Sequence, residues 1–450
     1  MRALPMPRWR PLNVDRGLPL PEVGQASTVF SLTALFGAYF GIYLLLGLPA
    51  LAGLAFGTAL GLLVIRSWIG RRSTPNFEAF LSRVLQGPPG NAAVFGFALS
   101  AVQCAYATSE LLILREIAKT ALGLRSDHAT ILTIGLAIIG YFYVLFGGYM
   151  AVFRTDVLQF VLVAIMAAAL CTITFRHGLP TGWTVQLVPR PGYWPMAFGT
   201  SRPLLYGYHF VIATVMGLGF LGVSPDAWKR VFIVAKLRKQ TPLRFAVFLA
   251  VGTAPFVVLV LLGIPTGLIP DGPVNVGQMF SAMLASDLLF VAAALGLVAS
   301  FLSSFDSALL ASVQVGLILK RKRKRTRNET PRFHWLMVTV LMTIFFLFTG
   351  LRPLSNPYLL ANVLLGAYAV IAGVELGTAG LLARLPENSL LWVLAVGGAV
   401  WMVYFSSELR SPSIPTTYQI NTVPGGVLLC LGTALFCKVL TIGKRRNARH

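Results

Sequence analysis

Charged residues are scarce in this chain, and acidic residues are the scarcest of them. Only 12% of the 450 residues are charged, and 15 aspartates and glutamates stand against 37 lysines and arginines. Hydrophobic residues make up 56% of the sequence, and the mean hydropathy is +0.75. This composition excludes a soluble domain held by a single anchor and predicts a polytopic membrane protein.

Cysteine and histidine are rare as well, with four and five residues. The cysteines all fall in apolar runs, so we expect no disulfides, and their spacing does not suit a metal cluster. The histidines are scattered, and no Ser–His–Asp arrangement has suitable spacing. We therefore predict that the protein is not an enzyme and has no resident cofactor.

Long apolar segments fill most of the chain. About 20 apolar residues in a helix span a bilayer, so these segments predict an all-α polytopic fold with about twelve transmembrane helices. The eighth segment is longer than an upright crossing needs and is expected to tilt or to extend into the cytoplasm. The segments lie near 28–46, 49–66, 92–114, 129–147, 156–175, 205–223, 244–268, 284–319, 334–350, 356–382, 388–405 and 424–441.

The positive charges predict the topology. With the N-terminus inside, the cytoplasmic loops and tails hold 29 of the 37 lysines and arginines. This bias predicts a multi-pass protein of the cell membrane with both termini in the cytoplasm. The net charge of +22 and the basic run 320–325 could suggest nucleic acid. The run lies at a helix end, however, where an anchor on anionic lipid is the better interpretation, so we expect no nucleic-acid partner.

Two predicted segments are interrupted by glycine. Segment one has Gly37 and Gly41 near its midpoint, and segment six has three glycines followed by Pro225. Interrupted spans in matching positions of two halves indicate a transporter with broken helices. Because the two segments are five apart, and an odd number of crossings reverses orientation, the repeat must be inverted. The alternative is that these glycines only allow close helix packing.

These breaks suggest a domain plan. Residues 1–26 form a cytoplasmic tail, and residues 27–382 form a ten-helix core. The core contains two inverted repeats, 27–176 and 205–382. Two additional helices (383–441) and a basic cytoplasmic tail (442–450) follow the core.

Segment eight carries polar residues at its centre. Ser300, Ser303, Ser304 and Ser307 are spaced by three and four, so they share a helix face, and Asp306 lies among them. Such groups are costly inside a membrane unless they meet a cavity, an ion or a partner helix. Hydroxyls and the carbonyls of a broken helix suit a sodium ion. Alternatively, the serines pack and bond to their own helix.

Several motifs resemble the sodium/solute symporter family, and its sodium/proline-transporter-like branch in particular. Residues 147–159 (GGYMAVFRTDVLQ) resemble the stretch between its fourth and fifth core helices, and residues 300–310 (SFLSSFDSALL) resemble its eighth. The resemblance covers roughly residues 28–380. It implies a leucine-transporter-type fold with a five-plus-five inverted repeat and broken helices 1 and 6. Shorter matches to core helices one and six lie at 47–49, 217–219 and 225–230.

The resemblance implies a sodium site. Its ligands would be the backbone carbonyls of Gly37, Phe40 and Ser300 and the hydroxyls of Ser303 and Ser304. Such neutral oxygens bind weakly, which suits an ion that has to be released.

The resemblance also assigns Asp156, which matches an aspartate on the inner exit path of the ion. The alternative is an N-cap, with Thr155 and Asp156 opening segment five.

Two positions depart from the family pattern. Ser300 replaces the usual alanine, a change that leaves the expected carbonyl ligand in place. Tyr39 stands where the sodium/proline branch has an acidic residue, which argues against proline specificity.

The solute is expected between the broken parts of segments one and six, facing segments three and ten. The apolar surroundings favour a small amino acid or a monocarboxylate and disfavour a sugar. Packing alone would also account for the aromatic members of the site. The candidate substrate-binding residues are Tyr39, Tyr43, Gln103, Phe220, Ser224 and Asn362.

Together these features predict a secondary active transporter. It would couple inward sodium flow to the uptake of a small organic solute by alternating access. The alternative is an uncoupled or proton-coupled transporter, or a sensor, on the same fold. Tyr39 motivates the uncoupled form, and Asp306 and Glu375 are the carboxylates that a proton-coupled form would use.

Overall fold

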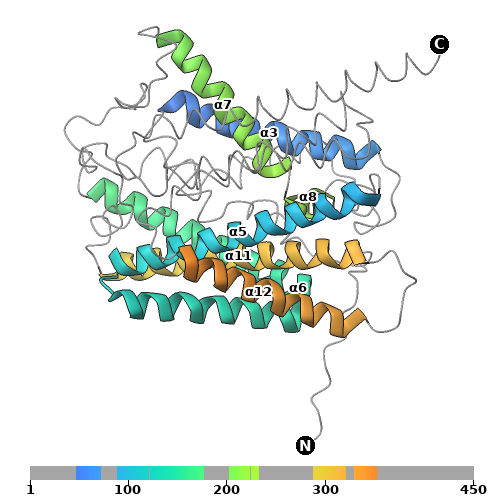
Figure 1. Ribbon diagram of the computed structural model, residues 1–450. Helices are drawn as coiled ribbons and strands as arrows, with labels where there is room; N and C mark the ends of the chain where they lie inside the picture. Colours follow the sequence, from blue (N-terminus) through green and yellow to red (C-terminus); the bar gives the residue numbers. More distant parts are fainter. Residues whose placement is uncertain are drawn as a thin grey trace, which may run out of the picture. The chain divides into compact units, whose positions relative to one another are not determined.

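Helices are the only regular elements in the described part of the chain. The computed structural model describes residues 47–71, 89–120, 122–176, 202–222, 224–232, 287–320 and 329–351. The helices are α3 (Leu48–Arg71), α5 (Pro89–Thr120), α6 (Ser126–Arg176), α7 (Arg202–Gly222), α8 (Pro225–Phe232), α11 (Asp287–Lys320) and α12 (Glu329–Leu351), shown in Figure 1. The predicted segments 28–46, 244–268, 356–382, 388–405 and 424–441 lie outside the described residues.

Gly47 marks the start of α3. Its φ of 80° is a conformation that glycine adopts without steric cost. The first helical turn follows directly, because the Leu51 amide donates to the Gly47 carbonyl over 3.3 Å. This start agrees with the predicted boundary between the first two apolar segments.

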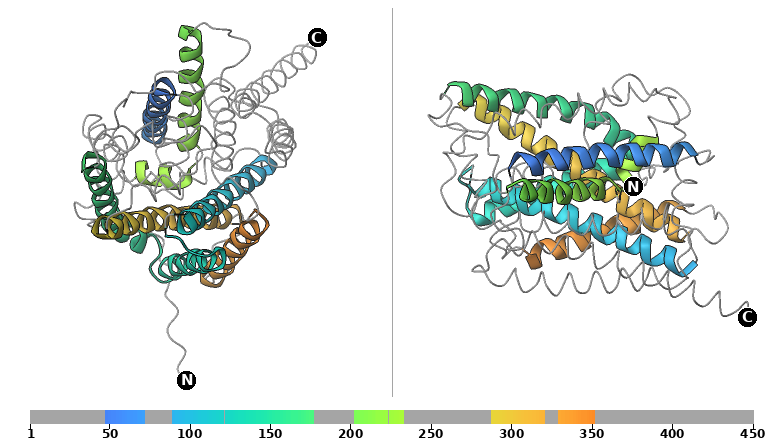
Figure 2. Two further views of the ribbon diagram at one scale, coloured as in Figure 1. Left: turned by 90° about the vertical axis from the view of Figure 1, so that its left-hand side faces the viewer. Right: turned by 90° about the horizontal axis from the view of Figure 1, so that it is seen from above.

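A break at Gly148 divides α6 into two helical segments. Gly148 has φ 55° and ψ −151°, values that do not occur within a helix. The first segment ends where the sequence predicts the end of segment four, at residue 147. Figures 1 and 2 show the two segments as separate arms of the chain.

The chain divides into two compact units. The first contains residues 1–41, 103–185 and 229–358, and the second contains 42–102, 186–228 and 359–450. Within the first unit, α11 packs against α6 and α12. Within the second unit, α3 packs against α7.

α11 is the most buried of the three membrane-length stretches that the structure describes. In its most apolar window 78% of the residues are buried, against 39% for the first segment of α6 and 28% for α12. Phe301 and Phe305 stack on α11 with ring centroids 5.5 Å apart. Gly140 lets α6 pack closely on the Phe305 ring, because a Cβ there would lie 3.2 Å from it. The polar residues of α11 are therefore held in a packed interior.

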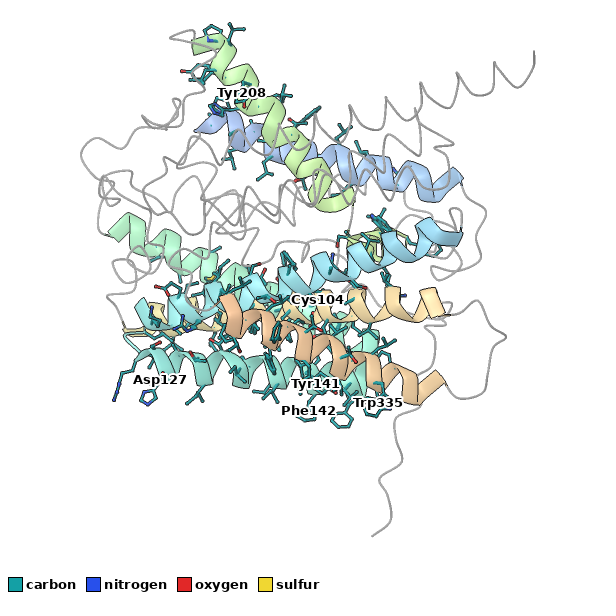
Figure 3. All side chains as sticks on the ribbon, viewed as in Figure 1. Cys104, Asp127, Tyr141, Phe142, Tyr208 and Trp335 are labelled. Carbon is teal, nitrogen blue, oxygen red and sulfur yellow. The ribbon has the colours of Figure 1, made fainter. Side chains whose placement is uncertain are left out.

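The outer faces of α6 and α12 are apolar and exposed. Figure 3 shows Phe142 and Trp335 pointing away from their helices, and Trp335 is 71% exposed. Among the described residues, three helical stretches are long and apolar enough to cross a membrane: Ser126–Gly148, Ala294–Gly316 and Phe333–Leu351. Large apolar surfaces of this kind are what contact with lipid requires.

α5 is tied to its neighbours in the first unit by polar contacts at two levels. The Arg115 side chain donates to Thr130 Oγ1 over 2.9 Å and to Ser126 Oγ over 2.7 Å, which fixes the turn into α6. Nearer the N-terminus of α5, the Cys104 thiol donates to Ser312 Oγ of α11 over 3.8 Å. α5 is therefore held in register with both α6 and α11.

In the second unit, α3 and α7 touch through glycine. A Cβ on Gly53 would lie 2.9 Å from the Cα of Phe210, and one on Gly57 would lie 2.7 Å from the carbonyl carbon of Thr214. Both distances are too short for a real side chain. The two backbones therefore pack in direct contact, as glycine permits in membrane helices.

Gly217 and Gly219 of segment six lie inside one continuous helix, and the break comes after them, at the end of the segment. α7 ends at Gly222, and α8 begins at Pro225. Ser224 lies at the break and caps α8, because its Oγ accepts from the Ala227 amide over 3.3 Å. Its carbonyl accepts from the Trp228 amide over 3.0 Å. Serine at the N-cap and proline at the first helical position are the residues that such a helix start favours.

Candidate functional site

A buried polar contact between α6 and α11 joins the two long motifs of the sequence. Ser303 Oγ on α11 donates to Asp156 Oδ1 on α6 over 3.1 Å. Asp156 has no exposed surface, and Ser303 is 3% exposed. Hydrogen bonds to a carboxylate are stronger than those between neutral groups. The bond therefore fixes the rotamer of Ser303 in a buried environment.

The second segment of α6 runs antiparallel to α11. Asp156 meets Ser303, and further along α6 the carbonyl oxygen of Leu162 lies 2.9 Å from the position of a Cβ on Gly296. Moving forward along α6 therefore means moving backward along α11. Residues between these two contacts lie in the same interface.

Asp156 does not cap a helix. The second segment of α6 begins after Gly148, so Asp156 lies two turns inside it. The Thr155 hydroxyl donates back to the carbonyls of Ala151 and Val152, both at 3.0 Å. The N-cap interpretation of Thr155 and Asp156 is therefore wrong, because the helix starts earlier than the sequence suggested. What Asp156 does instead is hold Ser303.

Ser304 bonds to its own helix. Its Oγ donates to the carbonyl oxygen of Ser300 over 2.9 Å, and both residues are buried. This contact is the self-bonding that the sequence left open as an alternative. The same two oxygens are predicted sodium ligands. With ion–oxygen distances of roughly 2.3–2.6 Å, as for the similar-sized Ca²⁺, two oxygens this close can bind one ion.

Two further buried polar atoms lie in the α6–α11 contact. Ser300 Oγ and Gln159 Oε1 have no hydrogen-bonding partner in the part of the chain that the structure describes. The sequence analysis did not single out Gln159, although it is the last residue of the 147–159 motif. Its position three residues after Asp156 is the signal that places it on the same helix face.

Asp306 is the other buried carboxylate of α11. It has no exposed surface, and apart from the adjacent Ser307 its oxygens have no hydrogen-bonding partner among the described residues. A helix turns about 300° over three residues, so Asp306 points to one flank of the Ser303 direction. It is not part of the Ser303–Asp156 contact.

The predicted substrate residues are divided between the two units. Gln103 is buried on α5 in the first unit. Phe220 lies in α7, and Ser224 caps α8, both in the second unit. Within the described residues, no three His, Cys, Asp or Glu side chains gather as a metal site. The predicted residues Gly37, Tyr39, Phe40, Tyr43 and Asn362 lie outside the described residues.

No protein-family model matches the sequence, and no curated protein matches it. The assignment to the sodium/solute symporter family therefore stays a prediction from the motifs.

Solved structures match over nearly the whole chain. A manganese transporter variant from Eremococcus coleocola is 11% identical, with a TM-score of 0.53, and the match covers 93% of each chain. A sodium-coupled sialic acid symporter in its substrate-bound, outward-open state is 16% identical, with a TM-score of 0.50, covering 93% of this chain and 90% of the other. A nucleobase-cation-symport-1 family transporter, closed with bromovinylhydantoin bound, is 12% identical, with a TM-score of 0.52, covering 94% and 93%. Identities this low show the fold, which is the leucine-transporter type of polytopic membrane protein.

Proposed function

We propose that this protein is a secondary active transporter that couples sodium entry to the uptake of a small organic solute. The observation that carries the proposal is the buried Ser303–Asp156 bond on α11, the most buried of the described membrane-length helices. All three structural relatives described above are named as transporters, and one of them is named as sodium-coupled. Function does not follow from fold alone, so the proposal depends on the polar face of α11.

Asp156 prepares Ser303 to bind a cation. A serine hydroxyl has one proton and two acceptor lone pairs. Because Ser303 gives its proton to Asp156, both lone pairs stay available on the oxygen. The carboxylate also polarises the hydroxyl, as partners behind a metal ligand do in other sites. Asp156 thus acts through Ser303, and it lies close enough to receive the ion on its way out.

The remaining ligands complete a weak site. The Ser300 carbonyl and the Ser304 hydroxyl are 2.9 Å apart on α11, and the carbonyls of Gly37 and Phe40 are the ligands proposed from segment one. Five oxygens without a formal charge would bind sodium loosely enough to release it. Coupling then requires that sodium and solute stabilise the same conformation. We propose a small amino acid or a monocarboxylate as the solute, in a cell membrane with both termini inside.

An uncoupled transporter of the same fold is the second candidate. Tyr39 favours it, because the motif match expects an acidic residue at that position in the sodium/proline branch. In this case the polar face of α11 would serve only to pack α6 against α11.

Uptake into liposomes tests the proposal. Purified protein is reconstituted, and radiolabelled amino acids and monocarboxylates are offered with an inward gradient of sodium or of choline. We expect one solute to accumulate above its external concentration only with sodium. Ser303→Ala combined with Ser304→Ala should abolish this accumulation, while Ser312→Ala on the same helix should retain it.

The possible results separate the two candidates. Uptake that merely equilibrates, with no effect of the sodium gradient, would establish the uncoupled transporter. Sodium-driven accumulation that survives the double substitution would show that Ser303 and Ser304 do not bind the ion. Accumulation driven by an inward proton gradient without sodium would show that the proton is the coupling ion.

A further inference from the structure

The sequence between α11 and α12 contains the longest uninterrupted run of basic residues in the chain, and the proposed function does not use it. Lysine and arginine alternate over residues 320–325. Between Lys320 and Arg332, eight basic residues stand against one glutamate. Both flanking helices contain stretches long and apolar enough to cross a membrane, Ala294–Gly316 and Phe333–Leu351. The basic run therefore begins where one membrane-length helix ends, shortly before the next one starts.

Packing between the two helices sets the depth of Trp335 relative to this charge. A Cβ on Gly316 of α11 would lie 3.4 Å from the Leu336 side chain of α12, so the helices touch at this level. Lys320, the last residue of α11, is four residues beyond Gly316, which is about 6 Å along a helix. Trp335 directly precedes Leu336. Its backbone therefore lies roughly one helical turn from the start of the basic run.

Trp335 lies on the outward face of α12. Its side chain is 71% exposed, and Met342 and Phe346 further along the helix are 60% and 79% exposed. Their spacing places the three side chains on one face, and Figure 3 shows Trp335 pointing away from the packed helices. Phe333 and Met337 are buried on the opposite face. Tryptophan is enriched where a lipid-facing helix reaches the membrane surface, because its ring is apolar and its N–H can donate a hydrogen bond.

We propose that the adjoining ends of α11 and α12 bind anionic phospholipids of the bilayer. The basic run 320–325 attracts the phosphate headgroups, and Trp335 contacts the glycerol region and the first acyl carbons beneath them. Basic clusters next to a membrane helix attract anionic lipid, and arginine binds phosphate through two parallel hydrogen bonds. The exposed apolar face of α12 favours a lipid over a free phosphate ion, because only a lipid supplies acyl chains to cover it. This interaction is separate from sodium coupling and goes beyond the proposed function.

Quenching of tryptophan fluorescence by brominated lipids measures the interaction. The full-length protein is placed in nanodiscs of phosphatidylcholine and phosphatidylglycerol in equal parts, with bromine near the glycerol end of the acyl chains of one lipid or of the other. The chain has eight tryptophans, so the signal of Trp335 is the difference between the protein and its Trp335→Phe variant. We expect brominated phosphatidylglycerol to quench Trp335 about twice as strongly as brominated phosphatidylcholine. Potassium chloride should reduce this excess, because salt screens surface charge.

Removal of three charges tests the basic run itself. Lys320→Gln, Lys322→Gln and Lys324→Gln are combined, with and without Trp335→Phe. The excess quenching by phosphatidylglycerol should fall by about half or more, because each basic residue near the surface strengthens the attraction of anionic lipid.

The basic C-terminal tail supplies a matched control. Lys444→Gln, Arg445→Gln and Arg446→Gln together remove the same charge from another part of the chain. This variant should keep the excess quenching of Trp335. Both triple variants should unfold at the wild-type temperature in nanodiscs of phosphatidylcholine alone, where no anionic lipid is present.

Each other result overturns the inference. Equal quenching of Trp335 by the two lipids would show no preference for anionic headgroups, and an excess that potassium chloride does not reduce would show that charge is not its cause. This salt titration uses the unaltered basic run, so it decides even if the glutamine variant of the run fails to fold. An excess that this variant retains would assign the attraction to charges elsewhere.

Two results would name a different occupant. Quenching of Trp335 by neither lipid would show that protein covers this face of α12. Labelled duplex DNA that binds the protein in phosphatidylcholine nanodiscs, with no excess quenching by phosphatidylglycerol, would assign the run to nucleic acid. Sodium-driven uptake is measured separately, so failure of this inference leaves the proposed function in place.

Discussion

Ser303 and Asp156 lie 147 residues apart in the sequence and share a buried hydrogen bond of 3.1 Å between Ser303 Oγ and Asp156 Oδ1. Each residue belongs to one of the two long motifs on which the family resemblance depends. The bond connects the two motifs directly, because the carboxylate from the α6 motif fixes the hydroxyl from the α11 motif. Sodium binding, as proposed above, depends on this pair.

Substitution of Asp156 tests the pair directly. Asp156→Ala leaves Ser303 without its acceptor, and loss of a hydrogen bond to a charged group costs about 1.5–3 kcal/mol. We expect a lower unfolding temperature in detergent and a higher sodium concentration at half-maximal stabilisation. Asp156→Asn keeps an acceptor oxygen of the same shape, so its loss of stability should be smaller.

Glu116 supplies the control for loss of an acidic side chain. It pairs with Lys119 at 3.0 Å, and both side chains are partly exposed. Exposed ion pairs contribute about 0–1 kcal/mol, so Glu116→Gln should behave like wild type. An unfolding temperature for Asp156→Ala equal to that of Glu116→Gln would contradict the role of the pair.

The glycine contact between α3 and α7 predicts a strong size limit. A Cβ on Gly57 would press on the backbone of Thr214, which cannot rotate away. Overpacking of this kind costs about 1–3 kcal/mol or more, so Gly57→Ala should lower the unfolding temperature and Gly57→Val should lower the yield of folded protein.

Gly207 provides the matched comparison on α7. A Cβ at this position would meet nothing within 4 Å. Alanine is favoured over glycine inside a helix by roughly 0.5–1 kcal/mol, so Gly207→Ala should unfold at the same or a higher temperature. Equal effects of Gly57→Ala and Gly207→Ala would show that α3 and α7 are not in backbone contact.

Ser224 has a capping role that is separable from solute binding. Loss of an N-cap costs about 0.5–2 kcal/mol, so Ser224→Ala should lower thermal stability in the absence of any solute. Ser224→Thr retains a capping oxygen and should recover most of it. If both variants unfold like wild type but lose solute uptake, Ser224 acts on the solute, as the sequence analysis proposed.

The sequence predicts where the helices lie along the chain better than it predicts which helices contact one another. Hydropathy places the long described helices, since a bilayer imposes length and apolar character on each of them separately, but it does not predict the short α8. Glycine and proline predict the break before Pro225 and the boundary at Gly47, because these residues act through local backbone geometry. Such local and composition-based features can be read without knowledge of the neighbouring helices.

The contacts between the described helices do not follow from residue spacing, for a physical reason. Helical spacing assigns Ser303 and Asp156 to faces of their own helices, but it does not say which faces meet. The closeness of α3 to α7 has a local signal, glycines four apart at Gly53 and Gly57, yet only the partner backbone shows that they are needed. The partnerless oxygens of Ser300 and Gln159 likewise become visible only when the two helices are brought together.

Ion-specific stabilisation is the most direct measure of sodium binding by the serines of α11. The purified protein is heated in detergent with increasing NaCl, KCl or choline chloride at matched ionic strength, beside the combined Ser303→Ala and Ser304→Ala variant. A ligand of the folded state stabilises it by RT ln(1 + [L]/Kd). We expect a saturable rise in unfolding temperature with sodium alone, and no such rise in the variant. Equal responses to all three salts, or a sodium response that the variant retains, would contradict it.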